Sequence, residues 1–82
     1  MTIRRITFYS RNSCHLCDSA WYVLHRAVAG RGNLHIERID VDSDPDLVRR
    51  YSDHVPVILL DGIEIARHRL DEDELLSRLA EP

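Results

Sequence analysis

The hydrophobic and polar positions along the chain change between strand-like and helix-like patterns. Residues 6–10 read "ITFYS", which is rich in β-branched and aromatic side chains and predicts a strand. From Cys14 to Ala29 the apolar residues fall within one half of a helical wheel. They are Leu16, Ala20, Trp21, Val23, Leu24, Ala27 and Val28. We expect an amphipathic helix there, with Ser13 as its N-cap.

The pattern then predicts a second strand and a short helix. Residues 34–42 read "LHIERIDVD", and their apolar residues change phase between Ile36 and Ile39, as in a strand covered on both faces. Asp44 as N-cap and Pro45 at the first helical position begin a helix of about two turns.

The last third of the chain predicts a hairpin and a final helix. Residues 55–67 form two short strands joined by Asp61-Gly62, a two-residue turn signal. The segment "LDEDELLSRL" begins with a capping-box pattern of Asp71 and Glu74. The full order is β-α-β-α-β-β-α, which predicts an α/β fold with a four-stranded mixed sheet flanked by three helices.

Composition and charge narrow the class of protein. A chain of 82 residues, 44% of them hydrophobic, forms one domain, which we assign to residues 1–82. A net charge of -3 argues against nucleic-acid binding, which needs a basic face. The start "MTIRRITFYS" has no apolar run of secretion-signal length, and no stretch approaches the ~18 apolar residues of a membrane span. We therefore expect a cytoplasmic protein without membrane contact.

Both cysteines lie in "SCHLCD", residues 13–18. In a reducing compartment such a pair is more typical of catalysis or metal binding than of a permanent crosslink. Residues three apart on a helix are close enough for a disulfide. Cys14 lies in the first turn, where N–H groups and the helix dipole favour a thiolate, whereas Cys17 lies within the apolar half. We expect Cys14 to attack a disulfide and Cys17 to resolve the intermediate.

Two other interpretations of the cysteines remain open. Tetrahedral zinc needs four ligands, and the chain has no second C-x-x-C and no histidines spaced as a pair, so redox chemistry is favoured over metal binding. A pair of ordinary buried thiols is the second alternative. His15 points about 100° away from Cys14 on the wheel, so we expect it to tune the thiolate through space rather than take its proton.

These motifs resemble those of the glutaredoxins, in the thioredoxin-fold superfamily. The similarity lies in a first strand that ends in Tyr9-Ser10-Arg11, a C-x-x-C that opens a helix, and Val55-Pro56 before a hairpin. It covers nearly the whole chain, which more closely resembles the small bacterial glutaredoxin-like proteins with an arginine-rich start and a "CHLC" type motif. The resemblance implies strand order 2-1-3-4, with the third strand antiparallel to the first.

The resemblance also implies roles for residues around the cysteines. Cys14 matches the family's nucleophile and Cys17 its resolving thiol. Arg11 stands where glutaredoxins carry a lysine that helps bind the glutathione carboxylate. Val55-Pro56 matches a segment whose proline is cis and whose backbone pairs with substrate. We therefore include these residues in the substrate site.

Further positions depart from the family pattern. His54 replaces a threonine, which places an imidazole near the rim, and His15 replaces the usual proline. Both join the predicted substrate site. Ala66-Arg67 stands where glutaredoxins have Gly-Gly, and four acids follow at the next helix start. We therefore expect no tightly bound cofactor, and these departures disfavour glutathione as the reductant.

Taken together, the sequence predicts a monomeric thiol–disulfide oxidoreductase that reduces protein or small-molecule disulfides and maintains cell redox homeostasis. Glutathione or a thioredoxin reductase would supply the electrons. The alternative is a thioredoxin-fold binding or regulatory module with little turnover and no glutathione site.

Overall fold

The computed structural model describes residues 3–81, and its elements follow the predicted order. They are β1 (Arg4–Ser10), α1 (His15–Val28), β2 (Leu34–Asp40), η1 (Val41–Ser43), α2 (Pro45–Tyr51), β3 (Val57–Leu60), β4 (Ile63–Arg67) and α3 (Glu72–Ala80). The 3₁₀ helix η1 was not predicted, and it ends β2 two residues early because the Asp40 side chain accepts the N–H of Asp42 at 2.9 Å. No helix within residues 3–81 is long and apolar enough to span a membrane.

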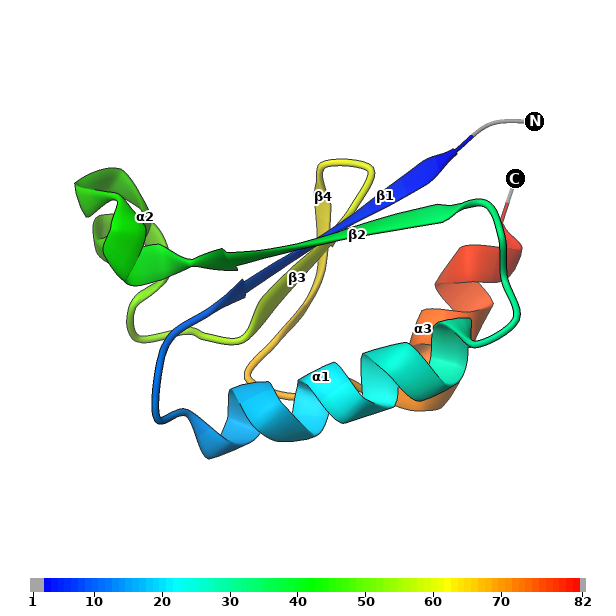
Figure 1. The fold of residues 1–82 in the computed structure, drawn as a ribbon, viewed down its shortest axis with the longest axis horizontal. Helices are drawn as coiled ribbons and strands as arrows, with labels where there is room; N and C mark the ends of the chain where they lie inside the picture. Colours follow the sequence, from blue (N-terminus) through cyan, green and yellow to red (C-terminus); the bar gives the residue numbers. More distant parts are fainter. Residues whose placement is uncertain (1–2, 82) are drawn as a thin grey trace.

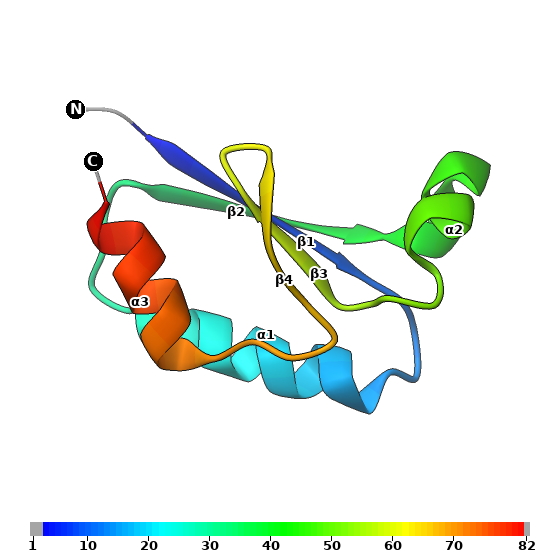
Figure 2. The ribbon, with the colours of Figure 1, turned by 180° about the vertical axis from the view of Figure 1, so that it is seen from behind.

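The four strands form one mixed sheet in the order β2-β1-β3-β4. β1 runs parallel to β2 and antiparallel to β3, and β3 runs antiparallel to β4. The predicted fold class and strand order are therefore confirmed. Helices α1 and α3 pack on the same face of this sheet, whereas α2 lies beyond the carboxyl end of β2 (Figure 1, Figure 2).

Our expectation that the second strand is covered on both faces is wrong. β2 is an edge strand, and none of its residues is fully buried. Helix α2 is only seven residues long and sits past the end of the sheet, so it does not cover β2. The phase change between Ile36 and Ile39 instead reflects two half-buried positions on opposite faces.

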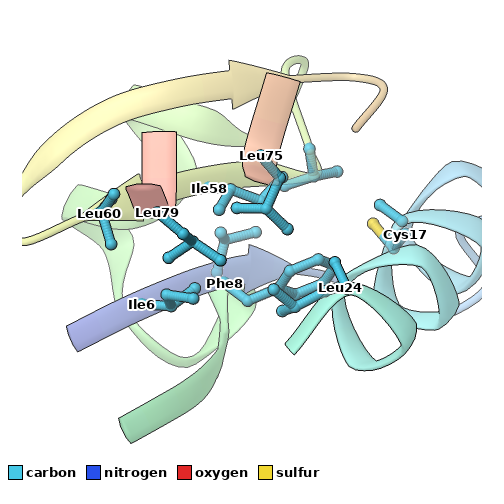
Figure 3. Close-up of a cluster of buried hydrophobic side chains, with 12 residues drawn as sticks. Ile6, Phe8, Cys17, Leu24, Ile58, Leu60, Leu75 and Leu79 are labelled. Atoms are coloured by element: carbon cyan, nitrogen blue, oxygen red, sulfur yellow. The ribbon is translucent and has the colours of Figure 1, made fainter. Parts of the chain in front are cut away.

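The core lies between the sheet and the pair formed by α1 and α3 (Figure 3). Alternate residues of β1 face this core, as expected for a strand with one covered face. The labelled members of the cluster are Ile6, Phe8, Cys17, Leu24, Ile58, Leu60, Leu75 and Leu79. Each is less than a tenth exposed, so one of the two cysteines belongs to the hydrophobic core.

The later helices begin as the sequence predicts. Asp44 caps α2 by accepting the N–H of Asp46 at 2.8 Å. Asp71 caps α3 by accepting the N–H groups of Asp73 and Glu74 at 2.9 and 3.4 Å. The Glu74 carboxylate binds Arg78 at 3.1 Å, so the return half of the capping box is replaced by an ion pair along the helix.

The hairpin turn ties three parts of the chain together. Asp61 and Gly62 both have positive φ, at 51° and 85°, as a tight two-residue turn requires. The Asp61 carboxylate accepts the Arg5 N–H and the Arg4 Nε–H, each at 2.9 Å. Arg4 also donates to the Glu81 carbonyl at 3.1 Å, just past the end of α3. The first strand, the hairpin and the last helix are thus joined.

Candidate functional site

The two cysteines lie at the start of α1, after the turn that follows β1, and are joined by a disulfide with their Cα atoms 5.2 Å apart. The prediction that Ser13 caps this helix is wrong. Ser13 has a φ of 57°, and the N-cap is Cys14, with extended φ and ψ of -115° and 104°. The chain must reverse between β1 and α1, and a left-handed residue at Ser13 makes that turn. Cys14 is therefore the residue that faces the first N–H groups of the helix.

The two sulfur atoms have different surroundings. The Cys17 N–H donates to Cys14 Sγ at 3.0 Å, and Cys14 is only partly buried. Cys17 is completely buried within the hydrophobic core. Backbone N–H donation and the positive end of the α1 dipole favour negative charge on Cys14 once the disulfide is reduced. Cys14 is thus the accessible sulfur and Cys17 the shielded one.

The residues between and after the cysteines point outward. His15 and Leu16 are both exposed, and Leu16 retains 38% of its surface. Our assignment of Leu16 to the buried face of α1 is therefore wrong, because Leu16 lines a surface pocket between α1 and the segment after β4. The Asp18 carboxylate lies 4.0 Å from the Arg38 guanidinium. Its negative charge near the cysteines is partly balanced by that contact.

The Val55-Pro56 segment lies at the same end of the sheet as the cysteines. Its peptide bond is cis, and both residues are buried. Because β1 and β3 are antiparallel and Tyr9 pairs with Val57, the end of β1 that leads to Cys14 lies beside the start of β3. The His68 N–H donates to the Pro56 carbonyl at 2.8 Å, which fixes the segment after β4 against it. The structure therefore gathers the cysteines and the cis proline in one region.

A pair of histidines beside this proline was missed by sequence reasoning. The rings of His54 and His68 have centroids 5.8 Å apart, and His68 Nε2 lies 3.2 Å from the Asp53 carbonyl. The Nδ1 atom of His54 is buried and has no hydrogen-bond partner among the described residues. The two histidines lie just outside the two strands of the predicted hairpin, so continuing that hairpin past its strands could have brought them near each other.

Arg11 is held by neighbouring residues. Its guanidinium donates to both carboxylate oxygens of Asp42, at 2.8 and 3.3 Å, and to the Ser52 carbonyl at 3.2 Å. These bonds join the loop after β1 to η1 and to the end of α2. A substrate carboxylate would have to compete with Asp42 for this guanidinium.

Ala66 and Arg67, which stand where glutaredoxins have Gly-Gly, are both held by contacts within the fold. Ala66 is half buried against the core, and Arg67 forms two hydrogen bonds of 2.8 Å to the Glu64 carboxylate. These bonds lower the pKa of Glu64. The positive φ at the end of β4, 69°, falls on His68. The left-handed backbone therefore falls on the residue after Ala66-Arg67, and Arg67 is bound to its own strand.

No metal centre is formed by the side chains of residues 3–81, in which no three His, Cys, Asp or Glu residues come together in an arrangement that could hold an ion.

Comparisons with known proteins agree with this geometry. Residues 5–80 match the family described as Glutaredoxin-like domain (DUF836). A glutaredoxin-like protein of Dictyostelium discoideum is 35% identical over 75 residues, which is 85% of this chain and 69% of that protein. A structural genomics target from X. campestris has a TM-score of 0.77 and 34% identity over 94% of this chain and 99% of its own. A mutant thioredoxin from Halobacterium salinarum shares the fold, with a TM-score of 0.66, 23% identity, and coverage of 94% and 72%.

The sheet order and the C-x-x-C pair at the start of α1 define a protein of the thioredoxin-fold class. Within that class, the chain belongs to the glutaredoxin-like domain family. The resemblance drawn from the sequence is therefore confirmed. A disulfide-bonded C-x-x-C in this fold indicates a redox function.

Proposed function

We propose that the chain is a dithiol–disulfide oxidoreductase in which Cys14 attacks the substrate and Cys17 resolves the intermediate. The observation that supports this proposal is the difference in exposure and hydrogen bonding between the two sulfur atoms. Cys14 is reachable and accepts an N–H at 3.0 Å, whereas Cys17 has no exposed surface. A disulfide exchange needs one thiol of each kind, because the first must meet the substrate and the second must wait for the mixed disulfide.

The reaction proceeds in two displacements. The Cys14 thiolate attacks one sulfur of a substrate disulfide, forms a Cys14–substrate bond and releases the other substrate sulfur as a thiolate. The Cys17 thiolate then attacks Cys14 Sγ, which re-forms the Cys14–Cys17 disulfide and releases the second substrate thiolate. Two electrons pass from the dithiol to the substrate, so an external thiol or dithiol must reduce the chain before the next cycle.

The substrate is proposed to lie across the cis-proline segment. The backbone of Val55, beside Pro56, would pair with an extended stretch of substrate, as in strand addition. His54 and the exposed His15 would border this stretch on either side of the sulfurs. All these residues come from one chain, so the mechanism needs no second copy. A working dithiol needs a reducing compartment such as the cytoplasm, where we place the protein.

Glutathione fits this chain poorly, so we propose a protein dithiol such as that of a thioredoxin reductase as the electron donor. The cation that the resemblance assigns to the glutathione carboxylate is Arg11, which already binds Asp42 and Ser52. Arg67, at the place of the family's Gly-Gly, carries a side chain bound to Glu64. Both features leave glutathione without its usual partners.

Cysteine variants test the mechanism directly. Cys14→Ser removes the attacking thiolate, so we expect turnover of a model disulfide to fall at least about a thousandfold. Cys17→Ser keeps the attack but not the resolution, so a mixed disulfide should accumulate and be seen by mass spectrometry. Ser77→Ala, on the exposed face of α3, is the control and should keep full turnover. Full turnover by Cys14→Ser would refute the mechanism, and a wild-type chain without turnover would favour the binding-module alternative.

A further inference from the structure

A small pocket lies between α1 and the loop that joins β4 to α3, which pass beside each other (Figure 2). Its volume is about 140 Å³. The helix contributes Leu16, Ala20 and Val23 to its wall, and the loop contributes His68, Arg69 and Leu70. None of these residues has a role in the disulfide exchange described above.

The lining of this pocket is mainly apolar. Ala20 is 2% exposed, Val23 and Leu70 are half buried, and Leu16 is exposed. The polar groups are the Ser19 hydroxyl and the side chains of His68 and Arg69. No carboxylate lines it. An apolar group therefore suits this pocket better than a cationic one.

The size of the pocket also restricts its occupant. Sites for whole small molecules usually measure ~300–1,000 Å³, more than twice the volume found here. An apolar cavity of ~150 Å³, by contrast, holds one benzene molecule. The pocket therefore has room for one large apolar side chain and not for a separate small-molecule substrate.

One wall of the pocket is tied by a hydrogen bond to the cis-proline segment and is fixed before any substrate binds. On the helix wall, Leu16 directly precedes the buried Cys17 in the chain. The opposite wall is fixed because the His68 N–H donates to the Pro56 carbonyl and the Arg69 N–H to the Arg67 carbonyl, each at 2.8 Å. His68, which lines the pocket, is thus one hydrogen bond away from the cis proline, so a substrate lying along the cis-proline segment would come close to this end of the pocket.

We propose that this pocket selects protein disulfides by receiving an aliphatic or aromatic side chain located within a few residues of the substrate cystine. This inference rests on the proposed function, because it names the substrate class of the same site. Glutathione has no apolar side chain and would leave the pocket empty. A polypeptide that carries Leu, Ile or Phe beside its disulfide would bury that side chain against Ala20, Val23 and Leu70.

A set of matched peptide disulfides tests the proposal. Each peptide carries a single Leu within three residues of one cysteine, on either side, and a reference peptide carries Ser at all those positions. Burial of one Leu side chain should raise kcat/KM by about tenfold for at least one placement relative to the reference. In Val23→Gln and Leu70→Gln this ratio should fall close to one. Tyr22→Gln is the matched control, because Tyr22 is on the same helix, 60% exposed and outside the pocket, and its ratio should stay at the wild-type value.

The outcomes separate the two proposals. Equal kcat/KM for every peptide, or a preference that persists in both pocket variants, overturns the assignment of the pocket and leaves the disulfide exchange standing. A wild-type chain that reduces none of the peptides, including the Ser reference, overturns the proposed function and with it this inference. The wild-type ratio is informative even where a variant fails to fold.

Discussion

The sulfur of Cys14 occupies the position that a serine or aspartate oxygen takes at most helix starts. A thiol is a weak hydrogen-bond acceptor, but a thiolate is a strong one, so this cap becomes stronger when the disulfide is reduced and the proton leaves. The N–H group of Cys17 thus has two effects: its hydrogen bond caps the helix and stabilises the reactive Cys14 thiolate. Arg11 shows the reverse case, in which a residue expected at the substrate is bound within the fold.

The contact between Arg11 and Asp42 predicts how glutathione use will respond to mutation. Asp42→Asn removes the negative partner of the guanidinium, so a glutathione carboxylate no longer competes with it. We expect the KM for glutathione as reductant to fall by about threefold to tenfold, with little change for a thioredoxin reductase. Steady-state reduction of a model disulfide with each donor measures both values.

The control for this comparison is Asp46→Asn, which removes a different exposed acid that pairs with Arg49. It should leave both KM values unchanged. Our account of the electron donor is wrong if the wild-type chain already uses glutathione as well as the reductase, or if Asp42→Asn leaves glutathione unaffected.

At the scale of elements, the site depends on joints between segments that are distant in the sequence. The His68–Pro56 bond holds the segment after β4 to the start of β3, at the end of the sheet that carries the cysteines. At the other end, Arg4 and Asp61 join β1, the hairpin turn and the end of α3. These contacts hold the segment after β4 and the end of α3 to the sheet, and so fix the wall of the pocket that faces α1.

The joint at Asp61 makes stability depend on pH. The Arg5 N–H, and then the Arg4 side chain, lower the pKa of Asp61 in the folded state. A lowered folded pKa means that its stabilising contribution is complete above the unfolded pKa, near pH 4, and is lost as pH falls through the folded pKa. Wild type should therefore exceed Asp61→Asn in free energy of unfolding at pH 7, and the difference should shrink below about pH 4.

Urea denaturation of both proteins between pH 7 and pH 2 gives this difference. Asp53→Asn is the matched control, since the described residues show no hydrogen bond or ion pair to its side chain. It should show a much smaller pH-dependent change. A difference between wild type and Asp61→Asn that stays constant across this range would show that the carboxylate charge contributes nothing.

At the scale of the whole molecule, the order of elements and the shielding of Cys17 were predictable from patterns in the sequence, and the sheet topology from the resemblance to the glutaredoxins. The hydrophobic periodicity and the Asp61-Gly62 turn are local signals, and the structure has the elements and the turn that they predict. The left-handed turn at Ser13 and the exposure of Leu16 were not predictable, because local patterns do not record how the chain turns between β1 and α1 or which side of α1 meets the segment after β4. The Arg11–Asp42 bond joins residues distant in sequence, which no local pattern records. The His54–His68 pair was missed because the hairpin was not followed beyond its two strands.

The central claim is that Cys14 is the reactive thiol and Cys17 the shielded one, and competitive alkylation tests it most directly. The reduced protein is treated at pH 7 with a limiting amount of iodoacetamide, and fragment-ion mass spectrometry locates the label. Because Cys14 is reachable and accepts an N–H, whereas Cys17 is buried in the core, we predict labelling of Cys14 at least about ten times faster. Equal labelling of the two cysteines, or faster labelling of Cys17, would contradict the account.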